Sequence, residues 1–141
     1  MATLAVDKPR VFENQGDVPV YNSLPAITND ILYAGSAIGI SSGYARPCTT
    51  SDEFAGFCVE KCDNTGGANG ALTVKVLAKG YVKLAVTGVS AVTHINDTVY
   101  LTDDDTFTLT ASGGLAIGKV FRWVSSTTCV VAFEALGNRS L

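Results

Sequence analysis

The chain has 141 residues and a net charge of −3, and 47% of its residues are hydrophobic while only 16% are charged. Ordinary domains carry roughly 25% charged residues, so we expect copies of the chain or another protein to cover part of this surface, with a low-charge monomer as the alternative. The sequence contains no basic block and no run of about 18 apolar residues, which argues against nucleic acid and membranes as partners.

Residues 1–29 differ in composition from the rest of the chain. They contain three of the four prolines, Pro9, Pro19 and Pro25, and their apolar residues follow neither a helical nor a sustained strand period. The opening MATLAVDKPRVF has no apolar run of signal-peptide length, so we expect synthesis in a cytoplasm. We interpret the segment as an extended N-terminal arm. Phe12 and Tyr21 indicate that it orders against a neighbouring protein, and a flexible tail is the alternative.

Residues 30–141 are predicted to form a β-domain. Short apolar or alternating runs are separated by turns rich in Gly, Asn and Asp, and no 3.6-residue period extends over a helix length. The first strand candidates are residues 31–40, 54–62, 72–77 and 81–87. Gly80 is expected to end one strand before the next begins. Residues 90–96 are expected to form a connection with room for one helical turn.

The most regular segment is 96–135. Val99 and Leu101, and then Phe107 and Leu109, alternate with polar residues, so each strand should turn one apolar row toward a core. We interpret the intervening turn, 103–105, as a solvated hairpin tip, because its three aspartates lack the spacing of an EF-hand calcium loop. Strands at 115–124 and 129–133 follow. The predicted fold class is therefore all-β, a single small β-sandwich or barrel domain with an extended N-terminal arm.

No catalytic, cofactor or metal site is predicted. Cys58 and Cys62, on one strand, would lie roughly 13 Å apart, too far for a disulfide, so the four cysteines are expected to be reduced and packed. The single histidine, His94, lies in a loop-like stretch without a partner pattern. The glycine-rich DNTGGANG at 63–70 lacks the Lys-Ser/Thr of a phosphate loop and precedes a strand. The sequence therefore indicates a protein that is not an enzyme.

Trp123 is the residue with the largest capacity to anchor an interface. It follows Arg122 on a predicted strand, and Trp and Arg are both favoured at interface centres. A core tryptophan of a β-sandwich is an equally good interpretation. We predict Arg122 and Trp123 as part of an interface between copies of the chain.

The order of five motifs resembles the head-decoration (capsid cement) proteins of tailed bacteriophages. In chain order they are FAGFCVEKCDNTGGANGALTVKV, GYVKLAVTGV, NDTVYLTDDDTFTLT, IGKVFRWV and CVVAFEA. The match covers about residues 54–135, and the NDTVYLTDDDTFTLT hairpin and the IGKVFRWV strand are its most specific parts. Two features depart from the family pattern: Cys58 and Cys62 replace small or aliphatic residues, and the arm has its own length.

This resemblance implies a structural virion protein: a homotrimer on the outside of an icosahedral head, near local threefold axes, that cements the expanded lattice of the major capsid protein. The arm would reach over neighbouring capsid proteins, and we assign its contacts to Arg10, Phe12, Tyr21 and Leu24. Two alternatives remain open. One is another virion β-module, such as a head-fibre base or a tail-associated domain; the other is a carbohydrate-binding β-sandwich.

Overall fold

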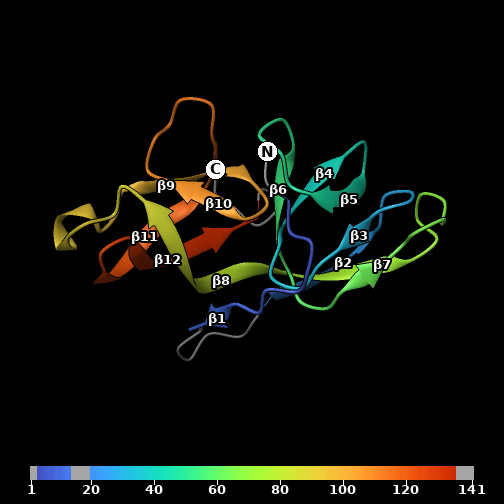
Figure 1. Cartoon of the computed structure of the whole chain (residues 1–141), viewed down its shortest axis with the longest axis horizontal. Helices are drawn as coiled ribbons and strands as arrows, with labels where there is room; N and C mark the ends of the chain where they lie inside the picture. The colour runs from blue at the N-terminus through green and yellow to red at the C-terminus, as the bar shows by residue number, and fades with distance from the viewer. Residues whose placement is uncertain (1–2, 14–19, 136–141) are drawn as a thin grey trace.

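The computed structural model describes residues 3–13 and 20–135, so parts of the predicted arm and the last six residues lie outside the described chain (Figure 1). The described residues form short to medium strands joined by turns, with one 3-10 helix, η1 (Val92–His94). The strands are β1 (Val11–Phe12), β2 (Val20–Pro25), β3 (Ile31–Leu32), β4 (Ala37–Ser41), β5 (Tyr44–Pro47), β6 (Glu53–Cys58), β7 (Cys62–Asp63), β8 (Thr73–Thr87), β9 (Thr98–Asp103), β10 (Thr106–Thr108), β11 (Leu115–Ser125) and β12 (Thr128–Glu134). The predicted all-β class is confirmed.

Five strands close into a barrel. Along the sheet the order is β8, β12, β11, β9 and β10, and each neighbouring pair is antiparallel. The barrel closes because β10 pairs in parallel with the end of β8, with Phe107 opposite Val86 and Thr108 opposite Thr87. The remaining strands of this sheet, β1, β2, β4, β5 and β6, flank the barrel, while β3 and β7 form a separate two-stranded sheet.

Strand β8 is continuous over 15 residues, so the predicted break at Gly80 was wrong. The ladder explains the difference: Gly80 lies opposite Phe133 of β12, and the residues on either side of it are also paired with β12. Glycine weakens a strand mainly through lost backbone entropy, and a ladder tied to a long neighbour outweighs that local preference.

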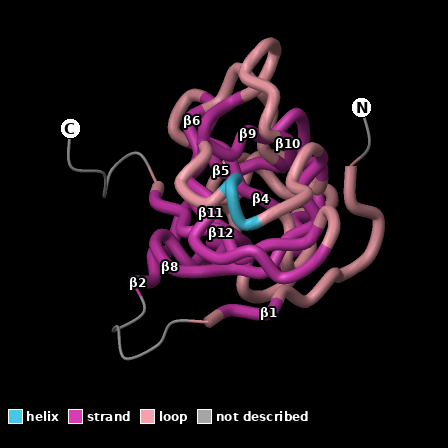
Figure 2. The backbone as a smooth tube through the Cα atoms, turned by 90° about the vertical axis from the view of Figure 1, so that its left-hand side faces the viewer, coloured by secondary structure: helices cyan, strands magenta, loops and turns pink. Residues whose placement is uncertain are grey.

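Both edges of β8 are used. Lys83 pairs with Val130 of β12 on one edge and with Val11 of β1 on the other, while Leu77 pairs with Phe57 of β6 and with Tyr21 of β2. Strands β1 and β2 therefore run one after the other along the edge opposite β12, as Figures 1 and 2 show. Within residues 1–29, Val11–Phe12 and Val20–Pro25 therefore belong to the sheet of their own chain.

The protein has two hydrophobic clusters that meet at β8. The larger cluster fills the barrel and centres on aromatic rings, with the Phe57 and Phe133 centroids 4.9 Å apart. The smaller cluster lies between the flanking strands and includes Leu32 and Ile38. Val76 faces the smaller cluster and the next residue, Leu77, faces the larger, because successive side chains of a strand point to opposite faces.

The predicted alternation in the hairpin is confirmed. Val99, Leu101 and Phe107 are buried in the barrel cluster, Leu109 packs partly buried against it, and the intervening positions 98, 100 and 102 are half-buried. The period of two therefore located both strands and the face that turns inward.

Gly118 provides a test of barrel packing. A Cβ at this position would lie 2.0 Å from the carbonyl oxygen of Ala132 on the neighbouring strand, so Gly118→Ala must push β11 away from β12. We expect this substitution to lower the free energy of unfolding by about 3 kcal/mol, measured by urea denaturation. Gly113→Ala is the control, because its Cβ meets nothing within 4 Å and only a left-handed backbone (φ +73°) opposes it, at about 1 kcal/mol. Equal losses in the two variants would contradict the packing explanation.

Candidate interaction surface

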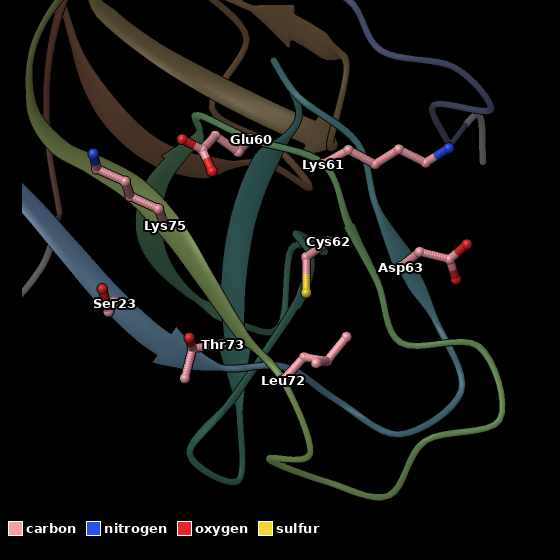
Figure 3. A pocket seen from close by; sticks show the side chains of 8 residues that line it. All are labelled: Ser23, Glu60, Lys61, Cys62, Asp63, Leu72, Thr73 and Lys75. Atoms are coloured by element: carbon pink, nitrogen blue, oxygen red, sulfur yellow. The ribbon is translucent and has the colours of Figure 1, made fainter.

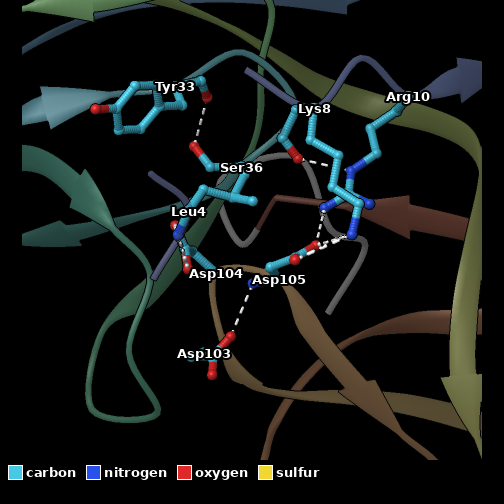
Figure 4. Close-up of polar contacts among 9 residues, drawn as sticks. Leu4, Lys8, Arg10, Tyr33, Ser36, Asp103, Asp104 and Asp105 are labelled. Carbon is cyan, nitrogen blue, oxygen red and sulfur yellow. Dashed lines mark hydrogen bonds and ion pairs between the residues drawn. The ribbon is translucent and has the colours of Figure 1, made fainter. Parts of the chain in front are cut away.

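Residues 3–10 cross over the acidic turn Asp103–Asp105 and form what we call the N-terminal strap (Figure 4). Arg10 donates from Nη2 to an Asp105 carboxylate oxygen at 2.7 Å, and its side chain is only 7% exposed. Lys8 Nζ lies 2.9 Å from the same oxygen, with a more exposed side chain. Two cations from the beginning of the chain thus neutralise one carboxylate of the barrel.

Backbone groups complete the attachment of the strap. The Leu4 N–H donates to the Asp104 carboxylate at 3.3 Å, and the Lys8 N–H donates to the Ala34 carbonyl at 2.7 Å. In return, the Ala34 N–H donates to the Asp7 carboxylate at 2.8 Å. The strap is therefore held by the chain's own residues at several points along its length.

The prediction of a solvated acidic turn was wrong. Asp103 is 4% exposed and Asp104 is 1% exposed, because the strap covers the turn and the Asp104 carbonyl accepts a hydrogen bond from the Ala37 N–H. Burial raises the pKa of Asp104 to about 6, and the neighbouring charges of Asp103 and Asp105 act in the same direction. Burial opposes ionisation of Asp105 as well, but the hydrogen bonds from Lys8 and Arg10 outweigh it and leave the pKa of Asp105 below its usual value.

The four residues predicted for arm contacts occupy different environments. Arg10 is paired with Asp105, and Phe12 packs on Phe57 and Phe133 in the barrel cluster, with ring centroids 6.4 and 6.3 Å away. Leu24 packs partly buried against the smaller cluster. Tyr21 is 51% exposed. A contact of these residues with a neighbouring protein stays a prediction, and of the four only the Tyr21 ring is presented largely to solvent.

A β-bulge in β11 lies directly before the two residues predicted for the trimer interface, Arg122 and Trp123. The register slips between Val120 and Arg122, so Phe121 is an extra residue in the strand. Phe121 is 52% exposed, the Arg122 side chain is also exposed, and Trp123 packs partly buried against the barrel cluster. Among the described residues, nothing accepts a hydrogen bond from the buried Trp123 Nε1–H. An interface role for Arg122 and Trp123 stays a prediction.

Sequence reasoning missed a row of basic and aromatic side chains on the outer face of β8. We call it the outer β8 stripe and define it as Lys79, Tyr81, Lys83 and Phe121. Lys79, Tyr81 and Lys83 occupy alternate positions on the part of β8 that pairs with β12, so they share a face. Lys75 lies beyond buried Leu77 and a register shift, so it is not part of this stripe. This shared parity was visible in the sequence, but the break expected at Gly80 concealed that the positions belong to one strand.

Aromatic contacts connect the stripe to its neighbouring strands. The rings of Tyr81 and Phe121 lie 4.6 Å apart and join β8 to β11, while outside the stripe Lys75 Nζ lies 4.5 Å from the centroid of the Tyr21 ring on β2. Val11 lies opposite Lys83 in the register, which adds an exposed aliphatic side chain beside the stripe. The result is a continuous surface in which cationic and apolar groups alternate.

A cavity of about 300 Å³ lies where β2 and β8 approach the β6–β7 connection (Figure 3). Cys62 lies at its centre, and the side chains of Glu60, Lys61, Asp63 and Lys75 point in different directions, away from the sulfur. Burial raises the pKa of the Cys62 thiol. The charged groups around this thiol therefore do not converge on it.

The cysteines are buried thiols without disulfide bonds. Burial raises the pKa values of Cys48 and Cys58 to about 12 and that of Cys129 to about 11, so these thiols are protonated near neutral pH. The described residues contain no group of three His, Cys, Asp or Glu side chains arranged to bind a metal ion. Likewise, no helix in the described ranges has the length and apolar character needed to span a bilayer.

Comparison with known proteins shows a structural similarity. No protein-family model and no curated protein matches the sequence. The structure is similar to a solved chain from the capsid of Myoviridae phage XM1, with a TM-score of 0.58 and 15% sequence identity. The alignment covers 95% of this chain and 92% of that one. At this identity the similarity shows a common fold over nearly the whole of both chains.

Asp105→Asn tests how strongly the strap is held. The substitution leaves the buried Arg10 guanidinium without its carboxylate, so we expect the free energy of unfolding to fall by about 2 kcal/mol. Amide hydrogen exchange at Lys8, whose N–H bonds to Ala34, should accelerate at the same time. Lys8→Ala is the control, since a largely exposed ion pair contributes about 0.5 kcal/mol. Unchanged exchange at Lys8 in Asp105→Asn would show that the backbone contacts hold the strap alone.

The raised pKa of Asp104 predicts that the free energy of unfolding depends on pH. Because its pKa is raised in the folded state, this carboxyl binds a proton more tightly when folded, so stability is gained as pH falls through about 6 and lost as pH rises. Between pH 7.5 and 5, the wild type should gain about 1 kcal/mol relative to Asp104→Asn. Denaturation curves of both proteins at the two pH values measure this difference. Parallel pH dependence in the two proteins would refute the assignment.

Proposed function

We propose that this chain is a structural protein of a phage virion that decorates and cements the outside of an icosahedral head. The observation that carries the proposal is the fold shared along nearly the full length of both chains with a chain of the phage XM1 capsid. A fold alone does not define a function, so a second line of support is needed. It comes from the ionisable groups: Asp105 and Asp52 pair with cations in structural contacts, and the charged side chains around the Cys62 cavity do not converge.

In this proposal the working unit is a homotrimer near local threefold axes of the expanded lattice of the major capsid protein. The low proportion of charged residues supports a surface that is partly covered in the assembled virion. Exposed Phe121 and Tyr21 are the kind of side chains that anchor protein interfaces. Trimerisation makes the second and third contacts with the lattice effectively intramolecular, so weak individual contacts combine into stable attachment.

The proposed stabilisation is a linkage effect. A protein that binds the expanded lattice and not the dissociated subunits favours the assembled shell by mass action. The partners in this proposal are the major capsid protein and two further copies of the chain, and nucleic acid and membranes play no part. The protein is made in the host cytoplasm and lies on the outer surface of the capsid.

Purified protein and expanded shells of the phage that encodes it test this function. We expect a trimer by native mass spectrometry, saturable co-sedimentation with the shells, and density near local threefold axes in electron cryomicroscopy of the decorated shells. A monomer that does not sediment with shells would overturn the proposal. Density at sixfold or axial positions would favour a head-fibre base or tail-associated module, and glycan binding without shell binding would favour a carbohydrate-binding module.

A further inference from the structure

The charges of this protein are unevenly distributed over its surface. The net charge is −3, yet four of the ten Lys and Arg residues lie on the outer face of β8 and the adjoining part of β11. They are Lys79, Lys83, Lys119 and Arg122. An acidic chain thus presents one face that is rich in cations.

Strand register places these cations on one face. Lys119 of β11 lies opposite Ala132 of β12, and Ala132 lies opposite Tyr81 of β8, so the three side chains lie side by side across the sheet. The bulge at Phe121 keeps Arg122 exposed and next to this row. The outer β8 stripe therefore extends sideways onto β11, and its two lysines lie about 13 Å apart along the strand.

The cations of this face differ among themselves in their partners. Arg122 forms an ion pair with Glu13, as Arg10 and Arg46 do with Asp105 and Asp52, so these charges are neutralised within the chain. No described carboxylate forms a salt bridge with Lys83 or Lys119. Positive charge without an internal counter-ion is available to an external one.

From this distribution we infer that the outer β8 stripe is the face that docks on an acidic protein surface of the capsid. The inference rests on the proposed function and adds the binding face and the charge of its partner. Complementary charge steers association and selects the partner, while aromatic anchors supply the buried contact. Lys79 and Lys83, beside the Tyr81 and Phe121 rings, provide both on one face.

A protein partner fits this face better than a nucleic acid. Surfaces that bind single strands present aromatic rings on which bases stack, but the Tyr81 and Phe121 rings pack on each other. Exposed Val11 and Val20 lie opposite Lys83 and Lys79, and aliphatic groups suit a protein contact. The net negative charge of the chain also opposes phosphate at long range.

A charge-reversal pair tests the inference with purified expanded shells as the probe. Lys83→Glu should weaken shell binding about tenfold at low salt, and the loss should shrink as salt is raised. Lys61→Glu is the matched control, because it makes the same charge change at an exposed lysine off the stripe. Lys79→Gln/Lys83→Gln, which removes charge without reversing it, should give a smaller loss in the same direction.

The apolar part of the stripe has its own pair of variants. Phe121→Ser should weaken shell binding about tenfold at both low and high salt, while Val92→Ser, at an exposed apolar residue on η1, should bind as the wild type does. All of these side chains are exposed, so each variant should keep the wild-type melting temperature and trimer mass.

The outcomes separate this inference from the proposed function. If the wild type binds shells and the stripe variants bind equally well, the docking face is wrong and the proposed function stands. If the wild type does not bind shells, both the docking face and the proposed function are wrong. Stripe variants that become monomers would reassign the stripe to the contact between copies. Tight binding of a single-stranded DNA oligonucleotide that Lys83→Glu abolishes, with shell binding unchanged, would reassign it to nucleic acid.

Discussion

The fold depends on hydrogen bonding along both edges of β8. A strand of 15 residues spans about 50 Å, and one edge binds β6 and then β12 while the other binds β2, β1 and finally β10. The side chains of β8 contribute to both hydrophobic clusters, with Val76 in one and Leu77 in the other. The barrel, the flanking strands and the beginning of the chain are therefore coupled through one element, and the exposed face of that element carries the outer β8 stripe.

Closure of the barrel is the weakest point of this arrangement. Strand β10 has three residues, and only Phe107 and Thr108 are in register with β8. The acidic turn precedes β10, and the N-terminal strap binds that turn through Arg10 and Lys8. The guanidinium of Arg10 also lies 5.7 Å from the centroid of the Phe107 ring, so the strap contacts the closing strand itself. The ion pairs therefore add stability where the hydrogen-bonded ladder is shortest.

The sequence correctly predicted the features that depend on residues close together in the chain, such as which face of a strand is buried. Alternation located Val99, Leu101 and Phe107 on the inward face, because a period of two is a local property of a half-buried strand. Three features depend on contacts between distant parts of the chain; two of them were predicted wrongly and one was missed. Gly80 continues its strand because β12 pairs with it, and the acidic turn is buried because residues almost 100 positions earlier cover it. Phe121 is an exposed aromatic residue because of a bulge in β11 that no local sequence pattern predicted.

The cations of the chain fall into two groups, those paired with carboxylates of the same chain and those exposed to solvent. Arg10 and Arg46 are bound to carboxylates that the fold buries or half-buries, and such charges contribute little to solubility because their partners cancel them. The lysines of β8 remain available to solvent, so an isolated subunit keeps its aromatic stripe hydrated through cations beside the rings. If the outer β8 stripe docks as we propose, an acidic surface replaces water there, so the lysines keep a counter-charge and the rings lose their exposed area.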